Sequence, residues 1–108
     1  MKLQKFVIEK QAVAGTLESS DLQIIIDKND GNGIEIELKS SVENQFGRRI
    51  REVLNSTLTN LGVEDAKLTV VDKGALDCTI IARTVAAVHR AANATDKIDW
   101  EGLEAWNA

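Results

Sequence analysis

The stretch LQIIIDKNDGNGIEIELKS, residues 22–40, decides the fold of this chain. Its first part, residues 22–27, is rich in β-branched residues, and residues 34–38 alternate Ile or Leu with Glu. Such alternation of period two is typical of a half-buried strand. Between the two parts lies Asn-Asp-Gly-Asn-Gly, residues 29–33, which adopt positive φ at low cost. The stretch therefore predicts two strands joined as a β-hairpin.

A long amphipathic helix is predicted directly after this stretch. Ser40, followed three residues later by Glu43, predicts a capping box at its start. Gly62 stands where a left-handed C-terminal cap is expected. The apolar residues between them recur at helical spacing: Val42, Phe46, Ile50, Val53, Leu54, Leu58 and Leu61. The helix needs an apolar surface to cover, and we expect the hairpin to supply it.

Shorter elements complete the predicted domain. Residues 12–17 predict a short edge strand or an ordered arm. Residues 67–72 predict a third strand and residues 76–82 a fourth, joined by a turn at residues 73–75. An alanine-rich helical pattern follows over residues 83–93. These elements predict an α+β fold in a single domain, with an antiparallel sheet of about four strands packed against two helices.

The length of 108 residues points to one domain rather than two. We expect a flexible N-terminal arm over residues 1–11, the folded domain over residues 12–93 and a polar C-terminal tail over residues 94–108. No segment has the length and apolar character of a signal peptide or a membrane span.

Charge and cysteine content exclude several classes of function. The formal net charge of −4 and the scattered Lys and Arg argue against nucleic-acid binding and against a polybasic membrane surface. Cys78 is the only cysteine, so the chain has no intrachain disulfide and no multi-cysteine metal site. A reducing, cytoplasmic location follows from this cysteine usage.

General motifs reveal no catalytic site. A minimal enzyme using Cys78 and His89 is one interpretation, but His89 lacks a carboxylate at helical spacing and is expected at the surface or half-buried. Cys78 is expected to be a small core hydrophobe in a strand. The cluster Arg48, Arg49 and Arg51 is expected to be the solvated face of the long helix, with a docking surface as the alternative.

Residues 14–21, Ala-Gly-Thr-Leu-Glu-Ser-Ser-Asp, stand out in the remaining sequence. Judged on spacing alone, the two serines between carboxylates indicate a turn or a cap. Serine hydroxyls in exposed turns are also the positions at which enzymes attach covalent groups, because the oxygen has to be reached from solvent.

This motif, AGTLESSD, resembles the N-terminal motif of the citrate lyase acyl carrier protein, or gamma chain, family. Gln-Phe-Gly at residues 45–47 and Asp-Lys-Gly-Ala-Leu-Asp-Cys at residues 72–78 match the same family in the same order. An Arg- and Ala-rich stretch, residues 82–92, follows as in the family. The resemblance spans residues 12–93, whereas the basic N-terminal extension and the Trp-bearing tail match only loosely.

The resemblance implies a non-catalytic carrier subunit whose first serine of the motif, Ser19, bears the prosthetic group. That group is 2'-(5''-phosphoribosyl)-3'-dephospho-CoA, joined to the serine by a phosphodiester. The implied partners are the alpha subunit, which exchanges acetate for citrate on the arm, and the beta subunit, which cleaves the citryl thioester to oxaloacetate. A cofactor transferase and an acetylating ligase are the further implied partners.

Two alternatives stay open beside the citrate lyase carrier. One is the acyl carrier subunit of malonate decarboxylase, which uses a similar prosthetic group. The other is a small interaction domain in which Ser19 is unmodified. We also hypothesise that Glu18 and Asp21 repel the phosphates of the arm and keep it extended.

Overall fold

The structure is a computed structural model that describes residues 6–40 and 43–92. Along the chain its elements are β1 (Ala12–Gly15), β2 (Leu22–Asp27), β3 (Ile34–Ser40), α1 (Glu43–Asn60), β4 (Ala66–Asp72) and α2 (Asp77–Ala91). The predicted α+β class, with four strands and two helices in one domain, is confirmed. The edge strand expected within residues 12–17 is β1.

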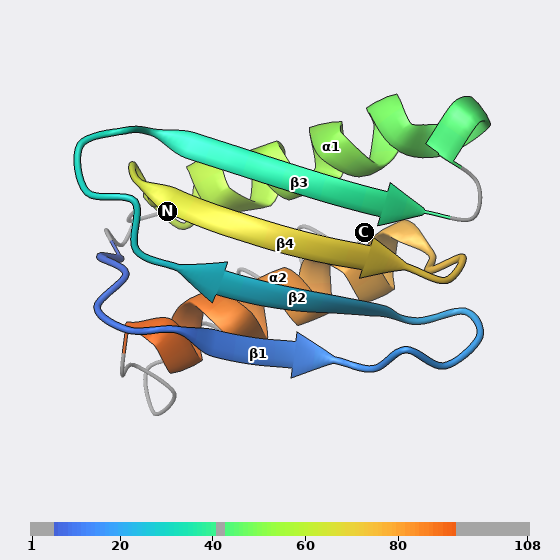
Figure 1. Ribbon diagram of the computed structural model, residues 1–108, viewed down its shortest axis with the longest axis horizontal. Helices are drawn as coiled ribbons and strands as arrows, with labels where there is room; N and C mark the ends of the chain where they lie inside the picture. Colours follow the sequence, from blue (N-terminus) through green and yellow to red (C-terminus); the bar gives the residue numbers. More distant parts are fainter. Residues whose placement is uncertain (1–5, 41–42, 93–108) are drawn as a thin grey trace.

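The four strands form one mixed sheet in the order β1-β2-β4-β3 (Figure 1). β1 and β4 each pair antiparallel with β2, whereas β3 pairs parallel with β4. The sequence predicted an antiparallel sheet. That part of the prediction is wrong, because β3 and β4 are parallel. The β3–α1–β4 unit is a parallel crossover, for which a helix is the usual connection.

The predicted hairpin of β2 and β3 is wrong, because β4 lies between these two strands. The turn itself is present: Asn32 donates its backbone N–H to the carbonyl of Asn29 at 2.9 Å, and Gly31 and Gly33 have positive φ. Gly33 then bonds to the first residue of β4, since its carbonyl accepts the N–H of Ala66 at 3.0 Å. The turn thus spans the width of one inserted strand instead of joining neighbours.

β4 lies in the middle of the sheet beside β2, and its inward apolar side chains are fully covered. Ala66, Leu68 and Val70 have no exposed surface. A central position gives each of them apolar neighbours on both sides, Ile24 and Ile26 from β2 being fully buried as well. Burial of these side chains, at roughly 25 cal/mol per Å² of apolar surface, outweighs the advantage of a local hairpin.

Both helices cover one face of the sheet (Figure 1). The predicted C-terminal cap of α1 is confirmed: Gly62 has φ of 72°, and the N–H groups of Gly62 and Val63 reach the carbonyls of Thr59 and Leu58 at 3.0 Å. This is a Schellman motif. At the other end, Ser40 is the last residue of β3, and its hydroxyl donates to Asp72 at 2.8 Å.

The fourth strand predicted over residues 76–82 is wrong, because α2 already begins at Asp77. The β-branched residues Thr79, Ile80 and Ile81 suggested a strand, but Ile80 and Thr84 are both buried and lie one helical turn apart. Packing of this helical stripe against the sheet overrides the local strand preference. Cys78, expected in the core, is exposed on the first turn of α2.

The N-terminal segment packs on the domain from residue 6 onward, although a flexible arm was predicted over residues 1–11. Phe6 and Ile8 are buried in the core. The Phe6 ring lies 4.6 Å from the ring of His89, and its backbone N–H donates to the carbonyl of Leu61. His89, expected at the surface or half-buried, is therefore buried. The predicted tail over residues 94–108 lies outside the described residues.

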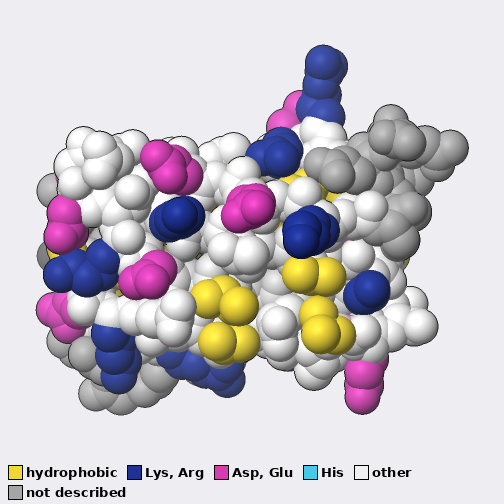
Figure 2. Space-filling model, viewed as in Figure 1, with side chains coloured by type: hydrophobic (Ala, Val, Ile, Leu, Met, Phe, Trp, Pro, Cys, Tyr) yellow, Lys and Arg dark blue, Asp and Glu magenta, His cyan; other side chains and the backbone are white. Residues whose placement is uncertain are grey.

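Figure 2 shows the opposite face of the sheet, which neither α1 nor α2 covers. Small groups of apolar side chains lie there among Lys, Arg, Asp and Glu side chains. The sheet residues Val13, which is exposed, and Ile25, which is half-buried and in register with it, belong to this face. Within the described part of the chain, no helix is long and apolar enough to cross a membrane.

Candidate functional site

Residues 16–21, called the Ser19 loop below, connect β1 to β2 at one end of the sheet (Figure 1). The loop begins with a close backbone crossing at Gly15. This residue has φ of 86°, and a Cβ atom placed there would lie 1.9 Å from the carbonyl oxygen of Leu22. Only glycine fits this position, so the path of the loop is fixed at its start.

Ser19 stands at the corner of a tight turn within this loop. The backbone N–H of Asp21 donates to the carbonyl of Glu18 at 3.2 Å, which closes a four-residue turn. Ser20, the third residue of that turn, has φ of 65°, the left-handed value that a type II turn requires at this position. The turn leaves Glu18, Ser19 and Ser20 exposed.

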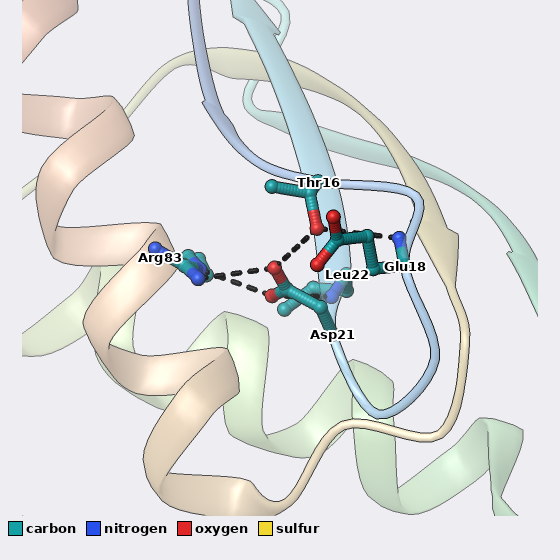
Figure 3. A network of polar contacts seen from close by, with 5 residues as sticks. All are labelled: Thr16, Glu18, Asp21, Leu22 and Arg83. Carbon is teal, nitrogen blue, oxygen red and sulfur yellow. Dashed lines mark hydrogen bonds and ion pairs between the residues drawn. The ribbon is translucent and has the colours of Figure 1, made fainter.

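The carboxylate of Asp21 ties the two ends of the loop to helix α2 (Figure 3). It accepts the hydroxyl of Thr16 at 2.6 Å and the backbone N–H of Leu22 at 2.8 Å. The guanidinium of Arg83 donates two further bonds through Nε and Nη2, both at 3.0 Å. Asp21 is only 9% exposed, whereas the Arg83 side chain is 40% exposed, so these contacts are partly withdrawn from solvent.

This arrangement changes the electrostatics expected from the sequence. Hydrogen bonds from Arg83 and then from Thr16 lower the pKa of Asp21 from 3.8 to about 2, so it is ionised at neutral pH. Its charge is compensated by Arg83 and faces α2. Of the two carboxylates that were hypothesised to repel the phosphates of the arm, Glu18 is exposed and Asp21 is not.

The other side of the loop is bonded to the turn after β4. Ser20 donates its N–H to the carbonyl of Lys73, and Lys73 donates its N–H to the carbonyl of Asp21, both at 2.8 Å. Two of the three sequence motifs, residues 14–21 and 72–78, thus meet in space. Leu17 and Leu76, one from each motif, are both exposed.

Ser19 has the surroundings that a covalent attachment requires. Its side chain is exposed, and within the described part of the chain its hydroxyl makes no hydrogen bond. A large substituent on the oxygen would displace no packed atom. The residues present therefore fit a serine-linked prosthetic group.

Cys78 and His89 do not meet as a catalytic pair. They lie eleven positions apart on α2, a rise of roughly 16 Å along the helix. Nδ1 of His89 lies 2.8 Å from the carbonyl of Val85, and Nε2 is buried with no hydrogen-bond partner among the described residues. Residues 6–40 and 43–92 also contain no group of three His, Cys, Asp or Glu side chains placed to hold a metal ion.

The arginine cluster of α1 is partly engaged within the domain. Arg49 binds Asp77 at the start of α2, with Nη2 2.7 Å from Oδ2. Arg51 donates to the carbonyl of Ile36 at 2.9 Å. Arg48 is exposed and remains the member of the cluster best placed to contact another protein.

Comparisons with known proteins agree with this geometry. The family model for acyl carrier proteins, described as malonate decarboxylase delta subunit (MdcD), matches residues 9–91. The citrate lyase acyl carrier protein of Streptococcus equi subsp. zooepidemicus strain H70 is 59% identical over 101 residues, which cover 94% of this chain and 98% of that protein. The citrate lyase acyl carrier protein of Streptococcus pyogenes serotype M4 is 58% identical over 93% of this chain and 97% of that protein.

A solved structure has the same fold at low sequence identity. A chain of the Pseudomonas malonate decarboxylase hetero-tetramer in complex with malonate aligns with a TM-score of 0.70 and 16% identity, covering 83% of this chain and 92% of that one. The likeness concerns the fold alone. Family model and curated relatives together show that the chain belongs to the acyl carrier protein family that includes the citrate lyase acyl carrier proteins.

Proposed function

We propose that the chain is the acyl carrier subunit of a citrate lyase complex and bears its prosthetic group on Ser19. The observation that carries the proposal is the exposed serine at the corner of a fixed turn, in a chain that is 59% identical to a citrate lyase acyl carrier protein. The group we propose is 2'-(5''-phosphoribosyl)-3'-dephospho-CoA.

When attached, the group supplies a thiol that carries acyl chains as thioesters. The chain itself then needs no base, metal or nucleophile of its own, because the reactive atom belongs to the cofactor. Its contribution is tethering, which raises the effective concentration of the acyl group at each catalytic subunit. We propose an alpha acyl transferase and a beta citryl lyase as these subunits, with acetate and oxaloacetate as products of citrate.

Attachment at Ser19 requires a phosphodiester to form at its oxygen. The Ser19 hydroxyl loses its proton, and Oγ forms a bond to phosphorus of a precursor activated as a triphosphate. The bond from that phosphorus to the diphosphate leaving group breaks, and diphosphate departs. Asp21 is a poor base for this proton, because its carboxylate is held by Arg83 and its pKa is lowered to about 2. We propose that the transferase supplies the base.

A carrier in malonate decarboxylase is the second candidate. It is favoured by the description of the matching family model and by the solved hetero-tetramer of the same fold. The higher identity to proteins named for citrate lyase favours the first candidate. Incubating the loaded chain with purified catalytic subunits of each complex separates the two, because only the matching complex regains activity.

The test of the carrier role is an intact mass of the chain after co-production with its cofactor transferase. We expect an increment equal to the CoA-derived group in the wild type and in Ser20→Ala, and none in Ser19→Ala. The wild type lacking the increment, beside a transferase proven active on another carrier, would favour the unmodified interaction domain. An increment that moves to Ser20 in Ser19→Ala would reject Ser19 as the unique site.

A further inference from the structure

We propose that Arg83, acting through Asp21, is a positioning residue that holds the Ser19 loop in the conformation recognised by the enzyme that modifies Ser19. The inference rests on the proposed function and extends it to a residue outside the serine motif. Arg83 lies on α2, 62 positions from Asp21, and Figure 3 shows it reaching from that helix to the loop.

The bonds to Asp21 form a closed frame around the loop. Oδ2 accepts the hydroxyl of Thr16, the first loop residue, and Thr16 Oγ1 in turn accepts the backbone N–H of Glu18 at 3.2 Å. Oδ1 accepts the N–H of Leu22, the first residue of β2. Arg83 binds both oxygens, so it fixes the plane of the carboxylate and with it the direction of every other bond.

The loop has little else to hold it. Leu17 is 54% exposed, and Glu18, Ser19 and Ser20 are exposed too, so no apolar side chain anchors the turn in the core. The positive φ of Ser20 is unfavourable for a residue with a Cβ atom. Apart from the side-chain frame, the turn depends on the Glu18–Asp21 bond and on two backbone bonds of Lys73, one with Ser20 and one with Asp21.

Removing the guanidinium leaves a buried carboxylate with fewer donors. The carboxylate then turns toward water, the bond from Thr16 is lost and the turn samples other conformations. An enzyme that recognises one conformation binds such a chain more weakly, in proportion to the fraction of time spent in that conformation. The expected signature is a raised KM of the transferase for the chain, with kcat little changed.

The experiment measures Ser19 modification by the transferase with a triphosphate-activated precursor, for the wild type, Arg83→Gln and Arg83→Lys. We expect KM to rise about tenfold in Arg83→Gln, a change that corresponds to about 1.4 kcal/mol. Arg83→Lys keeps the charge but not the two-bond geometry, so its KM should lie between the other two. Arg49→Gln is the matched control, because it removes an arginine–aspartate pair that also ends on α2 but does not touch the loop.

A second readout reports on the loop directly, without the transferase. Amide hydrogen exchange at Ser20 and Asp21 should accelerate about tenfold or more in Arg83→Gln. Amides at the centre of the sheet, such as that of Val70, should keep their protection, which excludes general unfolding. Thr16→Val provides a milder variant that removes one bond of the frame, and it should shift both readouts in the same direction if Arg83→Gln is too unstable to study.

The outcomes distinguish a failure of the positioning role of Arg83 from a failure of the proposed carrier function. Unchanged KM and unchanged Ser20 exchange in both Arg83→Gln and Thr16→Val overturn the positioning role. An equal rise of KM in Arg49→Gln also overturns it, since the effect would then be general. If the wild type itself is not modified, the proposed carrier function fails, and the exchange data alone decide whether Arg83 orders the loop.

Discussion

Among the described residues other than glycine, Ser20 alone adopts positive φ, and the cost of that conformation in stability is measurable. A left-handed backbone costs a residue with a Cβ atom roughly 1–2 kcal/mol, against an entropic cost of about 0.5–1 kcal/mol for glycine. We therefore predict that Ser20→Gly raises the free energy of unfolding by about 0.5–1 kcal/mol in urea denaturation and leaves Ser19 modifiable. Ser19→Gly, beside it in the same turn, should not stabilise the chain. Destabilisation by Ser20→Gly would contradict the assigned turn.

Asp21 makes the stability of the domain depend on pH in a defined window. Its pKa is lowered from 3.8 to about 2, mainly by the bonds from Arg83. The unfolded chain therefore takes up its proton first as pH falls, and the stability due to this carboxylate is complete above about pH 4 and lost toward pH 2. At neutral pH the shift corresponds to at most about 2.5 kcal/mol, which solvent screening reduces because the Arg83 side chain is 40% exposed.

The matching test is urea denaturation of Asp21→Asn across this range. We predict a loss of about 1–2 kcal/mol at pH 7 that shrinks between pH 4 and pH 2, because the Asp21 carboxyl of the unfolded wild type takes up its proton in this range while that of the folded state is still largely ionised. Asp30→Asn is the control, since this exposed carboxylate forms a surface ion pair with Lys28 at 3.6 Å. It should change stability little at any pH. A loss in Asp21→Asn that stays constant down to pH 2 would argue against the ionic frame.

At the scale of elements, both edges of the sheet have an arginine bound to an outward carbonyl. Arg90 donates to Val13 of β1 at 2.7 Å, and Arg51 donates to Ile36 of β3 at 2.9 Å. Unpaired edge carbonyls can bind a strand from another molecule, and charged side chains over an edge prevent this. Each of the two arginines thus covers a carbonyl on one edge strand of a small sheet.

The double variant Arg51→Gln, Arg90→Gln tests this protection. We predict a loss of about 1–2 kcal/mol of stability from two hydrogen bonds, together with oligomers at high concentration that are detectable by light scattering. Arg48→Gln with Arg49→Gln removes the same charge from α1 without uncovering an edge. Equal self-association of the two double variants would attribute the effect to net charge instead.

The elements also show what the sequence predicts and what it leaves open. Period-two alternation identified β2 and β3, and apolar spacing identified α1 with its Gly62 cap, because these patterns express one buried face. They do not say which strands are neighbours, so the insertion of β4 between β2 and β3 was missed. The start of α2 was missed because Thr79, Ile80 and Ile81 prefer strands locally, whereas the buried stripe that makes them helical extends beyond them to Thr84.

The candidate site, too, was predictable from the sequence only in part. The turn that exposes Ser19 is a local feature of a short motif, and the sequence pointed to it. Asp21 was interpreted only as a neighbouring charge, because its partner Arg83 lies 62 positions away and an isolated arginine on a helix carries no signal of what it binds. The motif at residues 72–78 gains a physical meaning only in the fold, where Lys73 bonds to both Ser20 and Asp21.

At the scale of the whole molecule, the first described residues close the core that the two helices leave open at one end. Phe6 and Ile8 are buried, and the N–H groups of Glu9 and Lys10 donate to the carbonyl of Ala91 at the end of α2. The Phe6 ring packs on the ring of His89, whose Nε2 has no hydrogen-bond partner in the part of the chain that the structure describes. The segment before β1 therefore belongs to the cooperative unit that holds α2, and through α2 it supports Arg83 and the Ser19 loop.

This coupling predicts that a change at residue 6 weakens the whole domain. Phe6→Ala should lower the free energy of unfolding by about 2–4 kcal/mol in a single urea transition, because it removes a buried ring and exposes His89. Val7→Ala is the matched control: this neighbouring side chain is 63% exposed, so its loss should cost less than about 0.5 kcal/mol. Similar losses in both variants would mean that the segment only rests on the surface. A large loss confined to Phe6→Ala would show that the segment stabilises the whole domain. If the rate of amide exchange at Ser20 then rises only as far as the lower free energy of unfolding requires, the local frame around Ser19 is intact.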